Sequence, residues 1–276
     1  MGILVGLIQQ IRYWDAASKW ALAIAVSLLL LALLMLSNGP AALRDAALIG
    51  VVGLLIVIQM IFLWGNRHLV TPYTQAQRHF IAGDFAAARD TLLAHLTELE
   101  QQGKRPDADI YVLLGNAYRN LSDLDESEQV LTKALQLQPT YHFPLYGFGR
   151  TLLAQGAYQG AVDVLQRALQ HGAPAVAQFD LGHAYYRLGT LDEAKTALLA
   201  GLSASQQEPH RELMTRYLLQ KLAPDAAQAP DAQLIEAGLP FWRAESQRFA
   251  DTPFGQALQA DIRAMQAMHS TDIDRP

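Results

Sequence analysis

The chain has 276 residues, of which 51% are hydrophobic, and its formal net charge at pH 7 is −5. It contains no cysteine, which excludes disulfides, cysteine-ligated zinc and thiol nucleophiles. The charge is unevenly distributed: residues 1–64 hold five charged side chains, and residues 65–276 hold 18 Lys or Arg and 24 Asp or Glu. The acidic balance of the second part argues against a nucleic-acid scaffold, which would need a basic face for phosphate.

Two uncharged apolar segments, residues 20–37 and 46–64, follow one another near the N-terminus. Each is about long enough to cross the ~30 Å hydrocarbon core of a bilayer, and the sequence NGP at 38–40 predicts a tight turn between them. We therefore expect two transmembrane helices in an antiparallel hairpin, with Trp20 and Trp64 at the same interface. A cleaved signal peptide is the alternative, but the second apolar segment follows at once and no convincing cleavage site precedes it.

The basic residues that flank these segments predict an orientation. Arg12 and Lys19 precede the first segment, Arg67 and Arg78 follow the second, and the turn holds only Arg44. Cytoplasmic loops carry an excess of Lys and Arg. We therefore expect both ends of the hairpin, and the domain that follows, on the cytoplasmic side.

Two further features of the N-terminal region bear on its packing. Residues 1–19 carry apolar side chains at helical spacing and predict an interfacial helix on the cytoplasmic leaflet, or one that packs on a partner's membrane helices. Small residues recur at four-residue spacing, as Ala21/Ala25 and Ala46/Gly50. They would let the two helices approach closely, or they would simply face lipid.

A repeat begins after residue 68. The glycine of LLGNAY, Gly115, recurs as Gly149 in GFGRTL and as Gly182 in DLGHAY, at steps of 34 and 33 residues. Twelve positions after each glycine stands a small residue: Ser127, Ala161 or Ala194. Self-similarity at a fixed period of this length predicts a stack of identical structural units.

This pattern resembles the tetratricopeptide repeat (TPR). Residues 111–139 match the family pattern nearly completely, at Tyr111, Leu114, Gly115, Tyr118, Ser127, Leu131, Ala134 and Pro139. A later unit departs from it at Gln178 and Gly201. The resemblance implies an all-α fold, in which a transmembrane helical hairpin is followed by a TPR α-solenoid of antiparallel helix pairs. The solenoid is expected at 69–208, in units of about 69–102, 108–141, 142–174 and 175–208.

Residues 209–276 are expected to hold C-terminal helices that cap the exposed end of the solenoid. Residues 210–222 carry leucines at helical spacing, and Thr252-Pro253 is typical of a helix start. We expect this last helix to fold back on the repeats, with docking on a partner protein as the alternative. A tail is predicted at 270–276.

The resemblance also implies a binding surface, because the first helix of each TPR unit lines the concave face of the stack. The family's lining positions fall on Asn116, Arg119, Asn120, Tyr146, Arg150, Phe179, His183, Tyr186 and Arg187. Arginine forks bind carboxylates, and aromatic rings bind apolar side chains. A protein or peptide with acidic or C-terminal carboxylate character would suit this surface. Otherwise these residues are ordinary solvated surface, or they contact the chain's own C-terminal part.

The sequence offers no sign of catalysis. It lacks the phosphate-loop, zinc-protease and nucleophile-elbow motifs. The glycines of GFGRTL lie in the repeat frame and follow no predicted strand. We expect no enzyme, no cofactor, no metal site and no nucleic-acid partner.

Together these features predict a membrane-anchored TPR scaffold or adaptor that binds a protein or peptide in its concave groove. The resemblance implies a place in the bacterial inner membrane, within an envelope assembly, secretion or polysaccharide-export complex. The alternative is a structural subunit of a larger membrane complex, whose groove is occupied by its own C-terminal helix.

Overall fold

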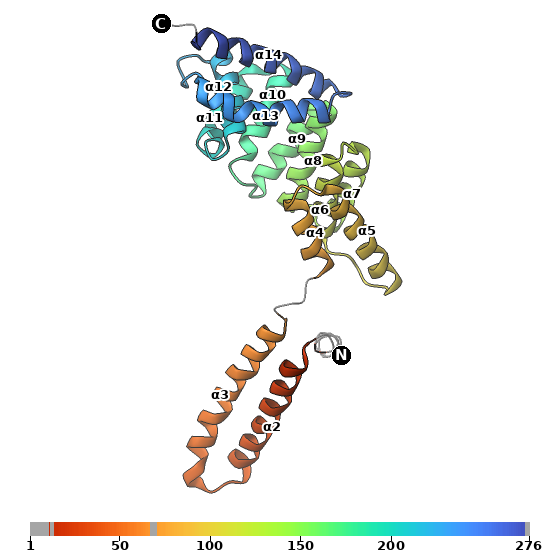
Figure 1. Ribbon diagram of the computed structural model, residues 1–276, viewed down its shortest axis with the longest axis vertical. Helices are drawn as coiled ribbons and strands as arrows, with labels where there is room; N and C mark the ends of the chain where they lie inside the picture. The colour runs from red at the N-terminus through yellow and green to blue at the C-terminus, as the bar shows by residue number, and fades with distance from the viewer. Residues whose placement is uncertain (1–10, 12–13, 67–70, 274–276) are drawn as a thin grey trace. The chain divides into compact units, whose positions relative to one another are not determined.

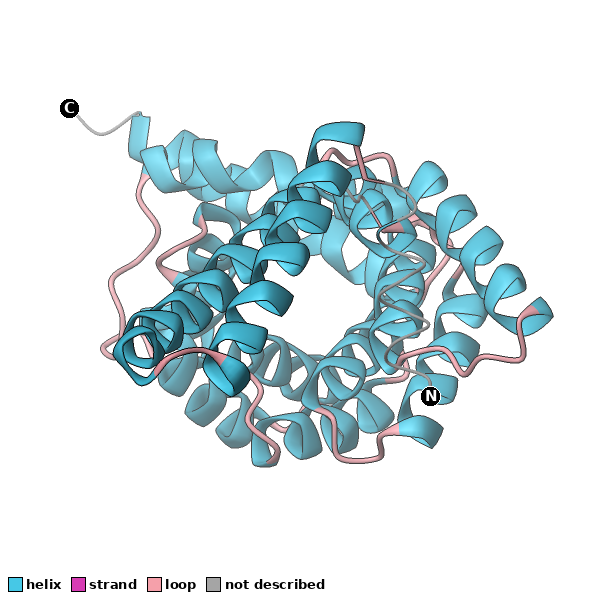
Figure 2. Ribbon diagram, turned by 90° about the horizontal axis from the view of Figure 1, so that it is seen from below, coloured by secondary structure: helices cyan, strands magenta, loops and turns pink. Residues whose placement is uncertain are grey.

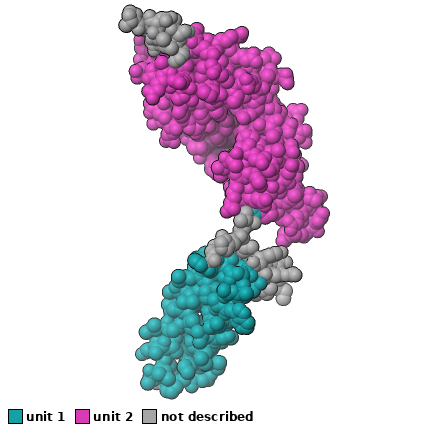
Figure 3. All heavy atoms as spheres, in the orientation of Figure 1, with its two compact units in different colours: residues 1–71 teal, residues 72–276 magenta. Residues whose placement is uncertain are grey.

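The computed structural model describes residues 11, 14–66 and 71–273, and every regular element in that part is a helix (Figure 1). The chain forms two compact units, residues 1–71 and 72–276 (Figure 3). The all-α fold expected from the sequence is therefore confirmed for the described residues. Most of the segment expected as an interfacial helix lies outside them.

The first unit is a pair of antiparallel helices, α2 (Ala16–Asn38) and α3 (Ala41–Asn66). Both are long and apolar enough to cross a membrane, with mean hydropathies of 2.5 and 2.8 over their most apolar stretches. Asp15 caps α2 by accepting a hydrogen bond from the Ser18 amide at 2.8 Å. Both helices extend beyond the uncharged segments, because a helix ends where its backbone hydrogen bonds end and not where charge begins.

The contact between α2 and α3 follows a regular spacing. Besides Ala21, the less exposed residues of α2 recur at alternate steps of four and three: Ser18, Leu22, Ala25, Leu29, Ala32 and Leu36. Such spacing is that of helices packed side by side in a left-handed pair. Of the small residues noted above, Ala25 is buried, but Ala46 is exposed and a Cβ added at Gly50 would meet nothing within 4 Å. The Ala46/Gly50 pair therefore does not bring the two helices together.

The second unit consists of consecutive helix pairs that follow a curved path (Figure 2). Its helices are α4 (Pro72–Ile81), α5 (Phe85–Gln101), α6 (Ala108–Asn120), α7 (Leu124–Leu137), α8 (His142–Gln155), α9 (Tyr158–Gln170), α10 (Ala177–Leu188), α11 (Leu191–Ser205), α12 (Pro209–Leu222), α13 (Ala232–Arg248) and α14 (Pro253–Ile273). The last of these reaches Ile273, so the predicted tail at 270–276 begins as helix.

The repeating glycines lie where the two helices of a pair cross. A Cβ added at Gly115 would lie 2.5 Å from Leu131 Cγ, and one at Gly149 would lie 2.5 Å from Leu165 Cγ. Ser127 replaces the alanine that is usual in the facing helix, and its buried hydroxyl donates to the Gly115 carbonyl oxygen at 2.8 Å. The period seen in the sequence is therefore the period of these close approaches.

The two departures from the repeat pattern lie close to one another. A Cβ added at Gly201 would lie 3.0 Å from the Cβ of Gln178 and 3.0 Å from the amide nitrogen of Phe179. A larger side chain at 201 would therefore force a small shift of the neighbouring backbone of α10.

The C-terminal helices fold back on the repeats. Helix α13 packs on α12, and α14 packs on α13 and on α8. The buried residues Trp242, Phe254 and Leu258 share one apolar core with Phe179 of α10 and Leu213 of α12. These two helices thereby cover the inner face of the third and fourth repeat units, as Figure 1 shows for α13 and α14 beside α10 and α12.

Candidate partner-binding site

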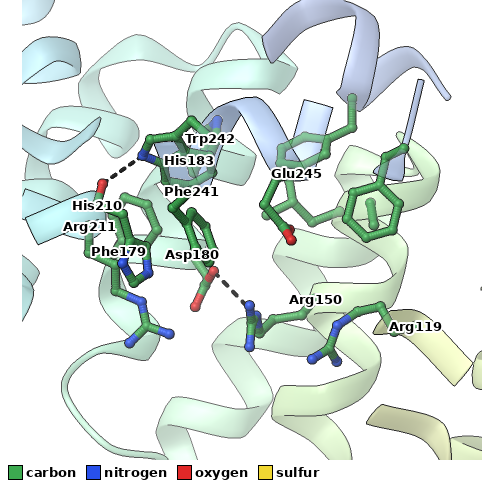
Figure 4. Close-up of a pocket in the computed structure, with 14 residues that line it drawn as sticks. Arg119, Arg150, Phe179, Asp180, His183, His210, Arg211, Phe241, Trp242 and Glu245 are labelled. Carbon is green, nitrogen blue, oxygen red and sulfur yellow. Dashed lines mark hydrogen bonds and ion pairs between the residues drawn. The ribbon is translucent and has the colours of Figure 1, made fainter. Parts of the chain in front are cut away.

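A pocket forms where the first helices of successive units, α6, α8, α10 and α12, meet α13 and the start of α14 (Figure 4). Its lining residues are Arg119, Arg150, Leu153, Ala154, Phe179, Asp180, His183, His210, Arg211, Phe241, Trp242, Glu245, Phe249 and Phe254. The space between them measures about 30 Å³, room for one or two water-sized groups. Arginine side chains from three different helices reach this one site.

Arg119 is the most unusual group in the pocket. Its side chain is buried, with 7% of the residue exposed, and its Nη1 donates to Asn116 Oδ1 at 2.7 Å and to the Gly147 carbonyl oxygen at 3.5 Å. Within the described part of the chain, no carboxylate forms an ion pair with it. Burial, reinforced by the nearby charge of Arg150, lowers the pKa of Arg119 to about 9. A guanidinium in this position would be stabilised by an anion.

Arg150 lies beside Arg119 but has its own counter-ion. Its Nε lies 3.7 Å from Asp180 Oδ1, and Asp180 Oδ2 accepts a hydrogen bond from the Tyr146 hydroxyl at 2.6 Å. Burial lowers the pKa of Arg150, but Asp180 and other negative groups outweigh it and raise the pKa overall. Burial and then Asp180 raise the pKa of Tyr146. These three side chains form a neutral set.

The remaining basic groups near the pocket are also paired. Arg211 Nη1 lies 3.2 Å from Glu208 Oε1, and Glu245 forms an ion pair with Arg248. His210 stacks on Phe241 with ring centroids 3.7 Å apart. Burial, followed by the charge of Arg211, lowers the pKa of His210 to about 4. Arg119 is therefore the one arginine lining the pocket that forms no ion pair with a described residue.

Phe179 and His183 were predicted to line an open groove, but the structure covers them. They are 2% and 1% exposed, and their ring centroids lie 6.2 Å and 5.9 Å from that of Trp242. His183 also contacts the Phe254 ring, with centroids 5.3 Å apart. Burial, with the charge of Arg187, lowers the pKa of His183 well below its usual value. Here α13 and α14 occupy the inner face.

Arg187 is enclosed by the same helices. It forms an ion pair with Asp261 of α14, and its Nε donates to His183 Nε2 at 3.2 Å. Asp261 also accepts from the Tyr217 hydroxyl at 3.1 Å. Tyr186 is half-buried, and its ring lies beneath the Arg187 guanidinium at 5.6 Å. Of these two predicted lining residues, Arg187 therefore contacts the chain's own C-terminal helix, and Tyr186 contacts Arg187 and Lys221 of α12.

Asn116 and Asn120 lie at the other end of the inner face. Asn120 Nδ2 donates to the Asn116 carbonyl oxygen at 2.8 Å, and Asn120 Oδ1 accepts from Arg248 Nη1 at 3.4 Å. Ser122 Oγ donates to the Arg248 carbonyl oxygen at 2.7 Å. The end of α13 is thus fastened to the second repeat unit.

Half of the pocket comes from residues that the repeat pattern does not indicate. Phe241, Trp242 and Glu245 share one face of α13, and Phe249 follows directly after its last residue. Together they close the pocket from outside the repeats. The aromatic pair Phe241 and Trp242, followed by Glu245 on the same helix face, is the sequence feature that could have indicated this wall of the pocket. Asp180 was missed because its place in the repeat faces the neighbouring unit.

The curved stack of helix pairs with side chains converging on its inner face defines the class of protein: an α-solenoid. Residues 108–141 and 152–217 each match a family model of the tetratricopeptide repeat. The second unit of the chain therefore contains tetratricopeptide repeats, and two apolar helices precede it. This repeat family typically serves as a non-enzymatic scaffold for protein interactions.

Several solved structures are similar to this chain. A MamA RS-1 double mutant is 18% identical, with 73% of this chain and 96% of that chain covered and a TM-score of 0.46. MamA from residue 41 of Desulfovibrio magneticus RS-1 is 22% identical (63% and 94% covered, TM-score 0.47). TTC0263, a thermophilic TPR protein of Thermus thermophilus, is 16% identical (71% and 97% covered, TM-score 0.48). No curated protein matches the chain in a sequence search.

Proposed function

We propose that this chain is a membrane-anchored scaffold that binds a protein partner through a carboxylate, held by Arg119 at the inner face of the repeats. One observation carries the proposal: a buried guanidinium faces a pocket and forms no ion pair with any described residue. Burying a charge without a counter-ion is costly. A C-terminal carboxylate or an acidic side chain of the partner would supply the missing charge.

The anchor in this proposal is the hairpin of α2 and α3. Large apolar side chains cover its outer faces, with Ile49 74% exposed and Trp20 70% exposed. An exposed apolar surface of this extent suits lipid rather than water. The flanking basic residues favour the TPR unit on the cytoplasmic side of a bacterial inner membrane. There it would serve an envelope assembly, secretion or polysaccharide-export complex.

The test is crosslinking and affinity capture from membranes with the Arg119→Met variant. Methionine keeps most of the side-chain volume and removes the charge. A hydrogen bond between charged groups contributes about 1.5–3 kcal/mol, so partner recovery should fall about tenfold or more. Arg167→Met is the matched control, because Arg167 is exposed on the outer helix α9. Recovery of the same partners at the same level by Arg119→Met would contradict the proposal.

A second function is favoured by the occupied part of the inner face. If α13 and α14 are a permanent filling, the chain is a structural subunit that joins its complex through the hairpin. Replacing α2 and α3 with an unrelated two-helix anchor separates the two ideas. A structural subunit would lose its partners, whereas a carboxylate-binding scaffold would keep them.

A further inference from the structure

Glu245 of α13 is an acidic side chain that lines the pocket of Arg119, Arg150 and Arg211, which we call the arginine pocket. It lies on α13, it is 9% exposed, and Figure 4 shows its carboxylate directed toward the space that Arg119 and Arg150 face. Burial and Arg150 lower the pKa of Arg119, and the negative charge of Glu245 opposes them. Glu245 thus partly fills the electrostatic role that a bound anion would have.

The same carboxylate secures the end of α13. Glu245 pairs with Arg248, and Arg248 makes the contacts with Asn120 and Ser122 of the second unit. At the other end of its pocket face, α13 is held by Trp242, whose Nε1 donates to the His210 carbonyl oxygen at 2.6 Å. A change at Glu245 would therefore act on one end of the helix and not on the other.

The pocket leaves little room for a second carboxylate beside Glu245. Its free space is about 30 Å³, and its walls include the apolar side chains of Phe249 and Phe254. Two carboxylates brought together in a site of this kind repel one another strongly. An incoming anion that binds Arg119 must displace the one already present.

We propose that Glu245 is an internal anion of the arginine pocket, and that the partner's carboxylate displaces it together with the end of α13. This inference rests on the proposed carboxylate-binding function and adds its regulation. Partner binding would release the contacts of Arg248 with the second unit. The C-terminal helices would then differ between the free and the bound scaffold.

The test uses the full chain in detergent micelles, with N-acetylphenylalanine as the carboxylate probe and N-acetylphenylalaninamide as its neutral twin. Trp242 is the one tryptophan of residues 72–276, so 5-fluorotryptophan gives a ¹⁹F resonance at the pocket wall, assigned with Trp242→Phe. The Glu245→Gln variant should bind the carboxylate about tenfold more tightly than the wild type. Glu236→Gln, an exposed position on the same helix, should leave the affinity unchanged, and the amide should not compete.

Hydrogen exchange supplies an independent readout. Saturating probe should speed amide exchange at residues 245–250 of the wild type and spare residues 235–242, and Glu245→Gln should show this faster exchange without probe. Equal or weaker binding by Glu245→Gln, or exchange at 245–250 that neither probe nor substitution changes, overturns the displacement alone. Absence of carboxylate binding in the wild type and in Glu245→Gln overturns the proposed function, and the displacement with it.

Discussion

Two arginines on the inner face of the repeats have opposite surroundings. Arg187 meets Asp261, a carboxylate that the chain brings back through α14. Arg119 meets the neutral Asn116 and a backbone carbonyl, and Glu245 nearby is already paired with Arg248. The fold supplies a carboxylate for Arg187, which we call the completed site. It forms no ion pair with Arg119, which we call the incomplete site. A repeat surface can thus be divided into a part that stabilises the protein and a part that, in our proposal, binds a partner.

The largest effect is expected from breaking the completed site. Asp261→Ala would leave Arg187 buried without a counter-ion and would remove the partner of Tyr217. Losing one member of a buried pair typically costs about 3–5 kcal/mol. Urea unfolding should show this loss, whereas Asp251→Ala, at an exposed position, should change little. A loss below about 1 kcal/mol would mean that α14 is not held by this pair.

Acid should weaken both regions through their histidines. The folded-state pKa of His210 is lowered to about 4, and that of His183 lies well below its usual value. The unfolded chain therefore binds more protons than the folded one below about pH 6.5, so stability falls as the pH decreases from there toward 4. For His210 the loss is up to about 3 kcal/mol. Unfolding measured across this range should show a smaller slope in His210→Asn; an unchanged slope would contradict the assignment.

A substitution in the Arg119 pocket should not reduce the free energy of unfolding, in contrast to Asp261→Ala. Arg119→Met removes a buried charge that lacks a counter-ion, so the free energy of unfolding should stay the same or rise by about 1 kcal/mol. The same variant is expected to lose its partner. The variant would then lose its partner without losing stability. Thermal unfolding of the variant and the wild type under the same conditions checks the stability. A marked loss of stability would show that Arg119 is instead a structural group.

The smallest effect is expected when the completed site is made apolar. Arg187→Met combined with Asp261→Leu replaces both members of the pair, which is often neutral or stabilising. We expect the double variant to lie within about 1 kcal/mol of the wild type, in contrast to Asp261→Ala. A double-variant cycle by urea unfolding gives the coupling, and additive losses would rule out a direct interaction.

The repeat pattern predicted the helix pairs well because it records local geometry. Gly115 and Gly149 must be small where the next helix crosses them, and that requirement is visible at fixed spacing. The pattern also tells which face of its own helix a residue takes, and so it indicated Arg119 and Arg187 together. It does not tell which later segment covers that face. The burial of Arg187 depends on Asp261, 74 residues away, and no spacing rule joins the two.

The link between Ser122 and Arg248 joins positions 126 residues apart. This hydrogen bond connects the second repeat unit directly to the end of α13. In a stack of helical repeats each unit contacts only its neighbours, so few contacts restrain the positions of distant units relative to one another. The link between Ser122 and Arg248 restrains the units that lie between these two residues. We therefore expect the junction where α4 and α5 meet α6, which lies outside this link, to be the least restrained part of the stack.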